Sequence, residues 1–222
     1  VFLLGLAGAG YVSHNVLQDN ARDEILQNAR IMMQGSLAAR GYTQSQIAPL
    51  LQNQLKYEFL PQSVAGYAAT EHFNELRKQY PDYTYKEATL NPTNPRDRAA
   101  DWEADIVNSF RNTAGQTEIV GERDTPSGRT LFLARPIQIK DPGCLRCHSV
   151  PDAAPASMIA RYGTANGFGW QHMEIVGAQV VSVPMEVPIQ RAEKTFKVFM
   201  MLLVALVSFI FVLLNVLLVS LV

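Results

Sequence analysis

The feature that most restricts how this chain can fold is the lack of charged side chains at both of its ends. Residues 198–222 carry no charge, and neither do residues 1–12. Because about 20 apolar residues suffice to cross the hydrocarbon core of a bilayer, the C-terminal run predicts a membrane-spanning helix. The N-terminal run is shorter, and we interpret it as the end of a first membrane helix. A signal peptide is the alternative, but neither a charged n-region nor an A-x-A cleavage site is visible.

These two runs divide the chain into three expected parts. Residues 1–12 end the first transmembrane helix, residues 13–197 form one domain of ordinary size, and residues 198–222 form the second transmembrane helix. Two spans would place both termini on one side of the membrane and the domain on the other. The net charge of −1 gives no sign of nucleic-acid binding.

A C-x-x-C-H motif lies in the second half of the middle domain, at Cys144-Leu145-Arg146-Cys147-His148. This pattern is the attachment signature of c-type haem. The two thiols add to the haem vinyl groups as thioethers, and His148 is placed to ligate the iron. Cys144 and Cys147 are the only cysteines in the chain. The motif therefore predicts one covalently bound haem c.

Three other interpretations of the cysteine pair are weaker. A structural zinc site usually needs four nitrogen or sulfur ligands, and the remaining histidines of this chain are scattered. A thioredoxin-like redox pair is expected at a helix start after a strand, and it leaves His148 unexplained. A structural disulfide between residues so close in sequence would be small and tight.

The spacing of apolar residues predicts several helices in the middle domain. The first runs from residue 13 to residue 39 and is ended by Gly41, as glycine often does. Thr43 with Gln46 resembles the capping box of a second helix. The other expected helices are residues 64–79, 101–112 and 153–162, and a final helix enters the last span.

The period changes in the second half of the domain, where strands are expected. Two strands, residues 117–122 and 130–139, are joined around the turn Pro126-Ser127-Gly128, and a third covers residues 173–183. The haem motif follows the second strand on a loop, and residues 80–98 are interpreted as rich in loop. This plan predicts an α+β fold, a PAS-like domain with a small antiparallel sheet flanked by helices, between two transmembrane helices.

Several separated stretches, in the same order, resemble the haem-c-binding, PAS-like periplasmic domain family, the Tll-like group. They are residues 59–64, 80–83, 87–95, 101–103, 121–123, 134–137, 144–149, 166–170 and 177–179. The resemblance covers most of the middle domain. It implies a single haem c in a domain that often precedes histidine kinase, cyclase or chemotaxis modules, although some members stand alone.

The side chains around the haem are only partly fixed by the motif. His148 is the expected proximal ligand, and for the sixth position we favour Met33, because the small residues that follow it let a flat macrocycle approach the helix. Rival ligands are His172, Met185 and Met158, and an open iron is a further alternative. His14 and His72 are interpreted as interfacial and solvated. Arg135, Lys140 and Arg146 are candidates to bind the haem propionates, with surface solubility as the equal alternative.

Two functions are compatible with these features, and neither is enzymatic. The first is a haem-based sensor of redox state or of a small ligand. The second is an electron-transfer cytochrome subunit of a photosynthetic or respiratory membrane complex. Because haem c is attached outside the cytoplasm, we expect the bacterial inner membrane, with the domain in the periplasm. The expected partners are the lipid bilayer, a second copy or a larger membrane complex, and a redox protein.

Overall fold

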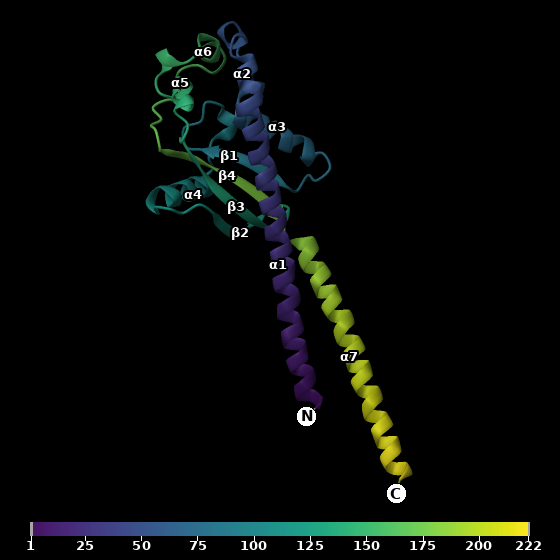
Figure 1. Cartoon of the computed structure of the whole chain (residues 1–222). Coiled ribbons are helices and arrows are strands. Elements are labelled where there is room, and N and C mark those ends of the chain that lie inside the picture. Colours follow the sequence, from purple (N-terminus) through teal and green to yellow (C-terminus); the bar gives the residue numbers. More distant parts are fainter. Residues whose placement is uncertain (1, 222) are drawn as a thin grey trace. The chain divides into compact units, whose positions relative to one another are not determined.

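The computed structural model of the chain describes residues 2–221 and divides into two compact units. Residues 28–184 form one unit, which we call the central unit, and residues 1–27 with 185–222 form the other. Helix α1, Phe2–Tyr42, is continuous through the boundary between them (Figure 1). The sheet and the C-x-x-C-H motif both belong to the central unit.

Four antiparallel strands form the sheet, in the order β1-β4-β3-β2. Their bounds are β1 Thr84–Thr89, β2 Ile119–Thr125, β3 Gly128–Gln138 and β4 Ile175–Pro184. Strands β2 and β3 form a hairpin in which Thr125 pairs with Gly128, as the turn signal predicts. The Val-rich β4 lies between β1 and β3 and is buried over nearly its whole length. The expected α+β class with a small antiparallel sheet is confirmed.

Helices and single helical turns make up most of the remaining structure. The helices after α1 are α2 Ala48–Leu51, α3 Ala65–Arg77, α4 Asp101–Asn112, α5 Leu145–His148, α6 Ala156–Tyr162 and α7 Glu186–Ser220. A π-helical turn, η1, covers Thr43–Ile47. The 3-10 turns are η2 Gln54–Lys56, η3 Pro61–Ser63, η4 Pro95–Asp97, η5 Pro142–Cys144 and η6 Pro151–Ala153.

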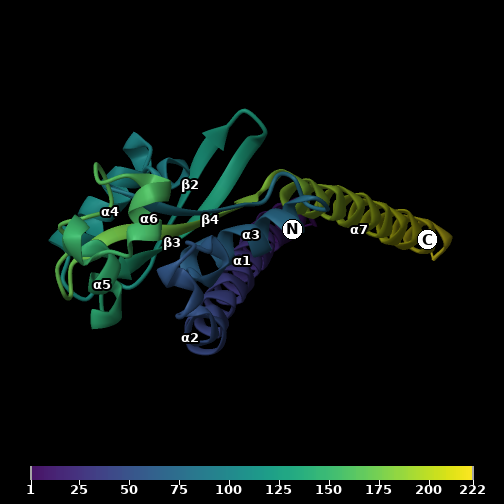
Figure 2. The same ribbon diagram turned by 90° about the horizontal axis from the view of Figure 1, so that it is seen from above.

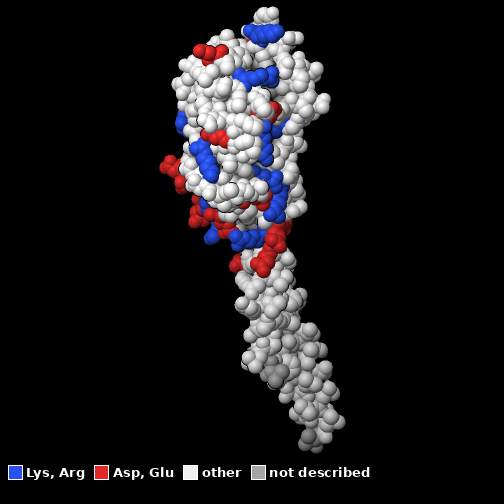
Figure 3. Space-filling view, turned by 60° about the vertical axis from the view of Figure 1, so that its left-hand side comes forward, with Lys and Arg blue, Asp and Glu red and all other residues white. Residues whose placement is uncertain are grey.

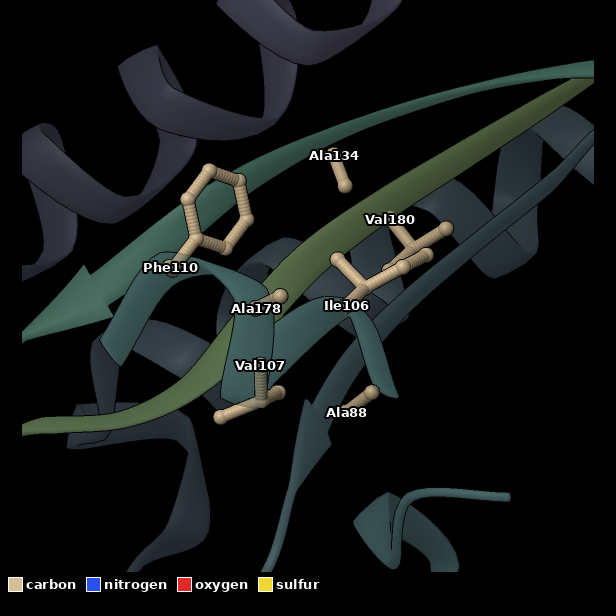
Figure 4. Packing of buried hydrophobic residues seen from close by; sticks show 7 residues of the cluster. All are labelled: Ala88, Ile106, Val107, Phe110, Ala134, Ala178 and Val180. Atoms are coloured by element: carbon tan, nitrogen blue, oxygen red, sulfur yellow. The ribbon is translucent and has the colours of Figure 1, made fainter. Parts of the chain in front are cut away.

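Helix α4 covers one face of the sheet, because the sheet residues beneath it are small. The register places Ala88 beside Ala178, and Ala134 beside Val180, on this face. The apolar side of α4 packs on them, as Figure 4 shows. The buried cluster consists of Ala88, Ile106, Val107, Phe110, Ala134, Ala178 and Val180. It fixes the sheet and α4 as one body, from which the segment that carries the motif extends.

The part of α1 that belongs to the central unit runs along the opposite face (Figure 2). Since side chains alternate along a strand, Tyr85 and Glu87 point away from α4. An ion pair joins Glu87 to Arg40 of α1, and Arg30 of α1 forms a second pair with Glu118. The first ion pair connects α1 to strand β1, and the second connects α1 to the residue that precedes strand β2.

Several local expectations are wrong. Gly41 does not end the first helix, and Thr43 does not cap a second one, because the chain continues from α1 into the π-helical turn and then into α2. Residues 80–98 are not all loop, since they contain the edge strand β1. The motif itself lies on η5 and the one-turn helix α5 rather than on a loop.

Helix α7 is the element that best fits a membrane span. Within residues 2–221 it is the one helix that is long and apolar enough to cross a bilayer, and none of its most apolar window is buried by protein. Figure 3 shows the lower part of the view without charged side chains, whereas patches of both signs of charge are scattered over the upper part of the visible face. The first transmembrane helix, expected to end in residues 1–12, is not confirmed.

Candidate functional site

The two cysteines and His148 are positioned by a short helical turn with a defined start. The carboxylate of Asp141 accepts a hydrogen bond from the amide of Gly143 at 2.7 Å, which caps η5. The chain then passes directly from η5 into α5, which ends at His148. Asp141 also accepts a hydrogen bond from the Gln44 side chain at 2.6 Å, so the motif is connected to η1.

The ring of His148 is held in one orientation by two contacts. Its Nδ1 lies 2.7 Å from the carbonyl oxygen of Gly167, and only a protonated Nδ1 can donate to a carbonyl. The indole of Trp170 stacks on the imidazole, with 4.0 Å between ring centroids and 16° between the planes. Nε2 of the neutral ring therefore keeps its lone pair. Orienting a metal-binding histidine through its other nitrogen is a general property of such ligands.

The loop that provides these contacts is itself fixed to the rest of the unit. The amide of Trp170 donates to the His148 carbonyl at 3.1 Å. Asn91 accepts a hydrogen bond from the Gly167 amide and donates one to the carbonyl of Phe168, both at 3.2 Å. Gly167 has φ +85°, and a Cβ there would lie 2.8 Å from the Cα of Thr93. Only glycine fits this position without displacing the loop.

Burial keeps the three motif side chains uncharged at neutral pH. Burial raises the pKa of both the Cys144 and the Cys147 thiol. The negative charge of Asp141 raises the pKa of Cys144 further. Burial lowers the pKa of His148, against the opposing effect of the Gly167 hydrogen bond. Both cysteines are free thiols and half-buried. Two thiols and a neutral imidazole are the donor set that covalent attachment and ligation of a haem require.

Cys144, Cys147 and His148 all line one cavity of about 400 Å³. Figure 1 shows α5 and α6 at the same end of the sheet as α2. Much of the lining is apolar or aromatic, which suits a flat macrocycle. These apolar residues include Phe59, Pro61, Val64, Ile137, Ile139, Met158, Tyr162 and Trp170. The wall from α1, η1 and α2 contributes Arg40, Gln44, Ala48 and Pro49.

A charged network forms part of the cavity wall. Arg40 pairs with Glu87, and both line the cavity. The Tyr85 hydroxyl donates to Glu87 at 2.8 Å, and Gln179 donates to the Tyr85 oxygen at 3.3 Å. Gly66 of α3 allows the close approach, since a Cβ there would lie 2.5 Å from the Glu87 carboxylate. A buried guanidinium thus faces the space beside the motif.

The structure brings only some of the predicted side chains to this cavity. Arg146 lines it, but Arg135 does not, because its guanidinium binds Glu118 at 3.0 and 3.2 Å. Lys140 is exposed and does not line the cavity either. Met33 is fully buried in the central unit but is not among the lining residues.

The rival candidates for the sixth ligand also differ in whether they line the cavity. Met158 is buried and lines the cavity. His172 is exposed, and its Nε2 lies 3.2 Å from the Lys140 carbonyl. Met185 is buried but belongs to the other unit. His14 contacts Phe196 edge-on, and His72 is exposed.

Residues that position the site were missed because they are far from the motif in sequence. Arg40 and Glu87 are separated by 47 positions, and Asn91 and Gly167 by 76. The sequence offers one signal that could have found the second pair. A glycine flanked by Asn166 and Phe168, after Gly163, suggests a tight turn, and such turns often carry a backbone acceptor.

Comparisons with known proteins show the family of the chain and a similar fold. No curated protein matches the sequence. The crystal structure of the cyanobacterial haem protein Tll0287 is similar, with a TM-score of 0.56 and 16% sequence identity over 72% of this chain and 95% of that chain. At this identity the likeness concerns the fold alone. The family model described as Tll0287-like matches residues 18–184, and the chain belongs to the Tll0287-like family.

Proposed function

We propose that the cavity binds one haem c, attached to Cys144 and Cys147 and ligated by Nε2 of His148. The observation that carries the proposal is the hydrogen bond from His148 Nδ1 to Gly167, because it leaves Nε2 free in a cavity that both thiols line. The similarity to a haem protein supports the same assignment. A bound haem would supply a redox-active iron with an exchangeable coordination position.

Two experiments on the full chain test the assignment. Haem staining on a denaturing gel should colour the wild-type band, because thioethers survive denaturation, and the double variant Cys144→Ser with Cys147→Ser should be colourless. His148→Ala should keep the covalent colour but change the spin state in the absorption spectrum. His172→Ala is the matched control, since His172 is exposed and does not line the cavity. An uncoloured wild-type band from cells with an active haem-attachment system would refute the proposal.

We further propose that the protein is a membrane-anchored sensor that lies at the outer face of a bacterial inner membrane and has no enzymatic activity. Helix α7 would be the anchor. The cavity wall from residues 40–66 offers side-chain amides, the hydroxyl of Ser63, apolar groups and Arg40, none of which is a strong iron ligand. Among the described lining residues, the competitors for the sixth position are the thioether of Met158 and the phenol groups of Tyr67 and Tyr162. A weak or absent sixth ligand favours the binding of an external small molecule.

The sixth position can be tested with carbon monoxide as the probe. Reduced wild-type protein should bind it and change its absorption spectrum. Met158→Ala should bind it at least as tightly, and Met33→Ala should not differ from wild type, because Met33 does not line the cavity. A low-spin spectrum that resists the gas in all three proteins would contradict the ligand-sensing proposal. Reporter fusions within residues 28–184 that are active only in the cytoplasm would contradict the topology.

Electron transfer is the second candidate function, and one observation favours it. Both cysteines are only half-buried, so the edge of an attached macrocycle would be accessible to a redox partner. This candidate predicts fast electron exchange with a soluble redox protein and no binding of carbon monoxide. The gas-binding experiment therefore separates the two functions.

A further inference from the structure

A second cavity, of about 440 Å³, lies in the central unit beside the edge strand β1. Side chains from α3, β1, η4, α4, β2 and β4 line it. It shares only Arg96 and Asp97 with the first cavity, so the short turn η4 separates the two. None of the motif residues reaches it.

The lining of this cavity contains more cations than carboxylates. Its charged residues are Arg77, Lys86, Arg96 and Arg123 against Asp97 and Glu103. Two of the four cations are already neutralised. Lys86 pairs with Glu103 at 2.6 Å, and Arg96 pairs with Glu71 at 2.5 Å while its guanidinium lies over the Tyr67 ring.

The other two cations have no carboxylate partner among residues 2–221. Arg77, in the last turn of α3, makes no ion pair. Arg123 of β2 contacts only the ring of Trp102, with its guanidinium carbon 4.1 Å from the ring centroid. This stacking fixes the guanidinium plane while its N–H groups remain free to donate. Arg77 and Arg123 come from separate elements at the margin of one cavity, and both are suited to bind carboxylates through two hydrogen bonds.

The rest of the lining adds neutral donors and an apolar surface. Thr84 and Ser182 are cross-strand partners, and both contribute to the lining. The Trp102 ring and Val180 provide apolar contacts. A compact inorganic anion would use one guanidinium and leave this apolar surface unused. An organic anion with carboxylates at both ends of a carbon chain would use all of these groups.

We propose that this second cavity binds a small organic dicarboxylate or tricarboxylate, with Arg77 and Arg123 as the carboxylate-binding residues. Ligand binding here goes beyond the haem function and does not depend on it, because neither arginine lines the first cavity. A small-molecule site next to a haem cavity would add a second input to the same domain.

Isothermal titration calorimetry of the full chain in detergent micelles tests the proposal. The probes are a series of linear dicarboxylates from malonate to adipate, together with citrate, acetate and phosphate. At least one dicarboxylate or citrate should bind, and acetate and phosphate should bind about tenfold more weakly or not at all, since each engages one guanidinium. No heat with any dicarboxylate or citrate, or tightest binding of phosphate, would overturn the proposal.

Variants then assign the site. Arg77→Gln and Arg123→Gln should each weaken binding about tenfold, as expected for the loss of one charge-assisted contact. Arg129→Gln is the matched control, because Arg129 lies on the same hairpin as Arg123, pairs with Glu122 and does not line the cavity. An equal loss in all three variants would indicate general charge attraction and refute the site. Should Arg123→Gln impair folding, Arg77→Gln remains decisive, because the Arg77 side chain is exposed.

Discussion

The ion pair between Arg40 and Glu87 should make the stability of the central unit depend on both charges. The two side chains are only 25% and 11% exposed. Burial by itself lowers the pKa of Arg40, but the charge and the hydrogen bond of Glu87 outweigh it, and the pKa is raised. The guanidinium is charged in any case, and Glu87 is the group that compensates its charge in this partly buried site.

The size of the effect follows from the cost of leaving one charge unpaired. Removing one partner of a buried ion pair destabilises a protein by about 3–5 kcal/mol. Arg40 keeps some exposure to the cavity, so we expect about 2–3 kcal/mol for Glu87→Gln, which retains an acceptor for the Tyr85 hydroxyl. Arg40→Met should cost a similar amount. The double variant should cost about 2 kcal/mol less than the sum, since neither charge is then left alone.

Urea unfolding of the full chain in detergent micelles, followed by tryptophan fluorescence, measures these differences. The matched control is Arg30→Met on the same helix. Arg30 is 49% exposed, and Glu118 keeps Arg135 as a partner, so this variant should cost no more than about 0.5 kcal/mol. Single-variant costs below those of the control, or costs that simply add in the double variant, would refute the reasoning.

Three further predictions concern other parts of the central unit. Gly167→Ala should displace the loop that holds His148, because a Cβ collides with Thr93, and it should broaden the haem spectrum and lower the thermal midpoint. Burial raises the pKa of Asp97 from 3.8 to about 6, so the ionised carboxylate opposes folding above pH 6. With a 24% exposed side chain, Asp97→Asn should stabilise by about 1 kcal/mol at pH 7, and the gain should vanish towards pH 4 in pH-dependent urea unfolding. Phe110→Ala should cost about 3–5 kcal/mol, measured in the same assay, because its ring is buried between α4 and the sheet.

The parts of the fold that sequence reasoning predicted are those in which local pattern and tertiary burial agree. Helix α4 has a clear apolar side, and the hairpin of β2 and β3 has a turn signal at the correct place. Strand β4 is a Val-rich run buried on both faces. A period of 3.6 residues identifies α4, whereas the turn signal identifies the hairpin and a short run rich in Val identifies β4.

The C-x-x-C-H motif was equally informative about the site, because its spacing alone fixes which atoms face one another. The side chain that faces the sixth coordination position was not predictable in this way. The small residues that follow Met33 favour it as a ligand, yet Gly35 and Ala38 are exposed and Met33 does not line the cavity. Small residues on a helix permit a close approach, but they do not say whether anything approaches them.

The missed strand and the missed arginine have one physical cause. Strand β1 has the sequence TYKEAT, and its buried face carries Glu87 where an apolar residue would mark a strand. A carboxylate is stable there only because Arg40 reaches it from a helix 47 positions earlier. Arg40, in turn, is an ordinary polar residue at the end of a helix unless Glu87 is known to face it. A pair of buried charges therefore conceals both of its elements from local pattern, and each can be recognised only together with the other.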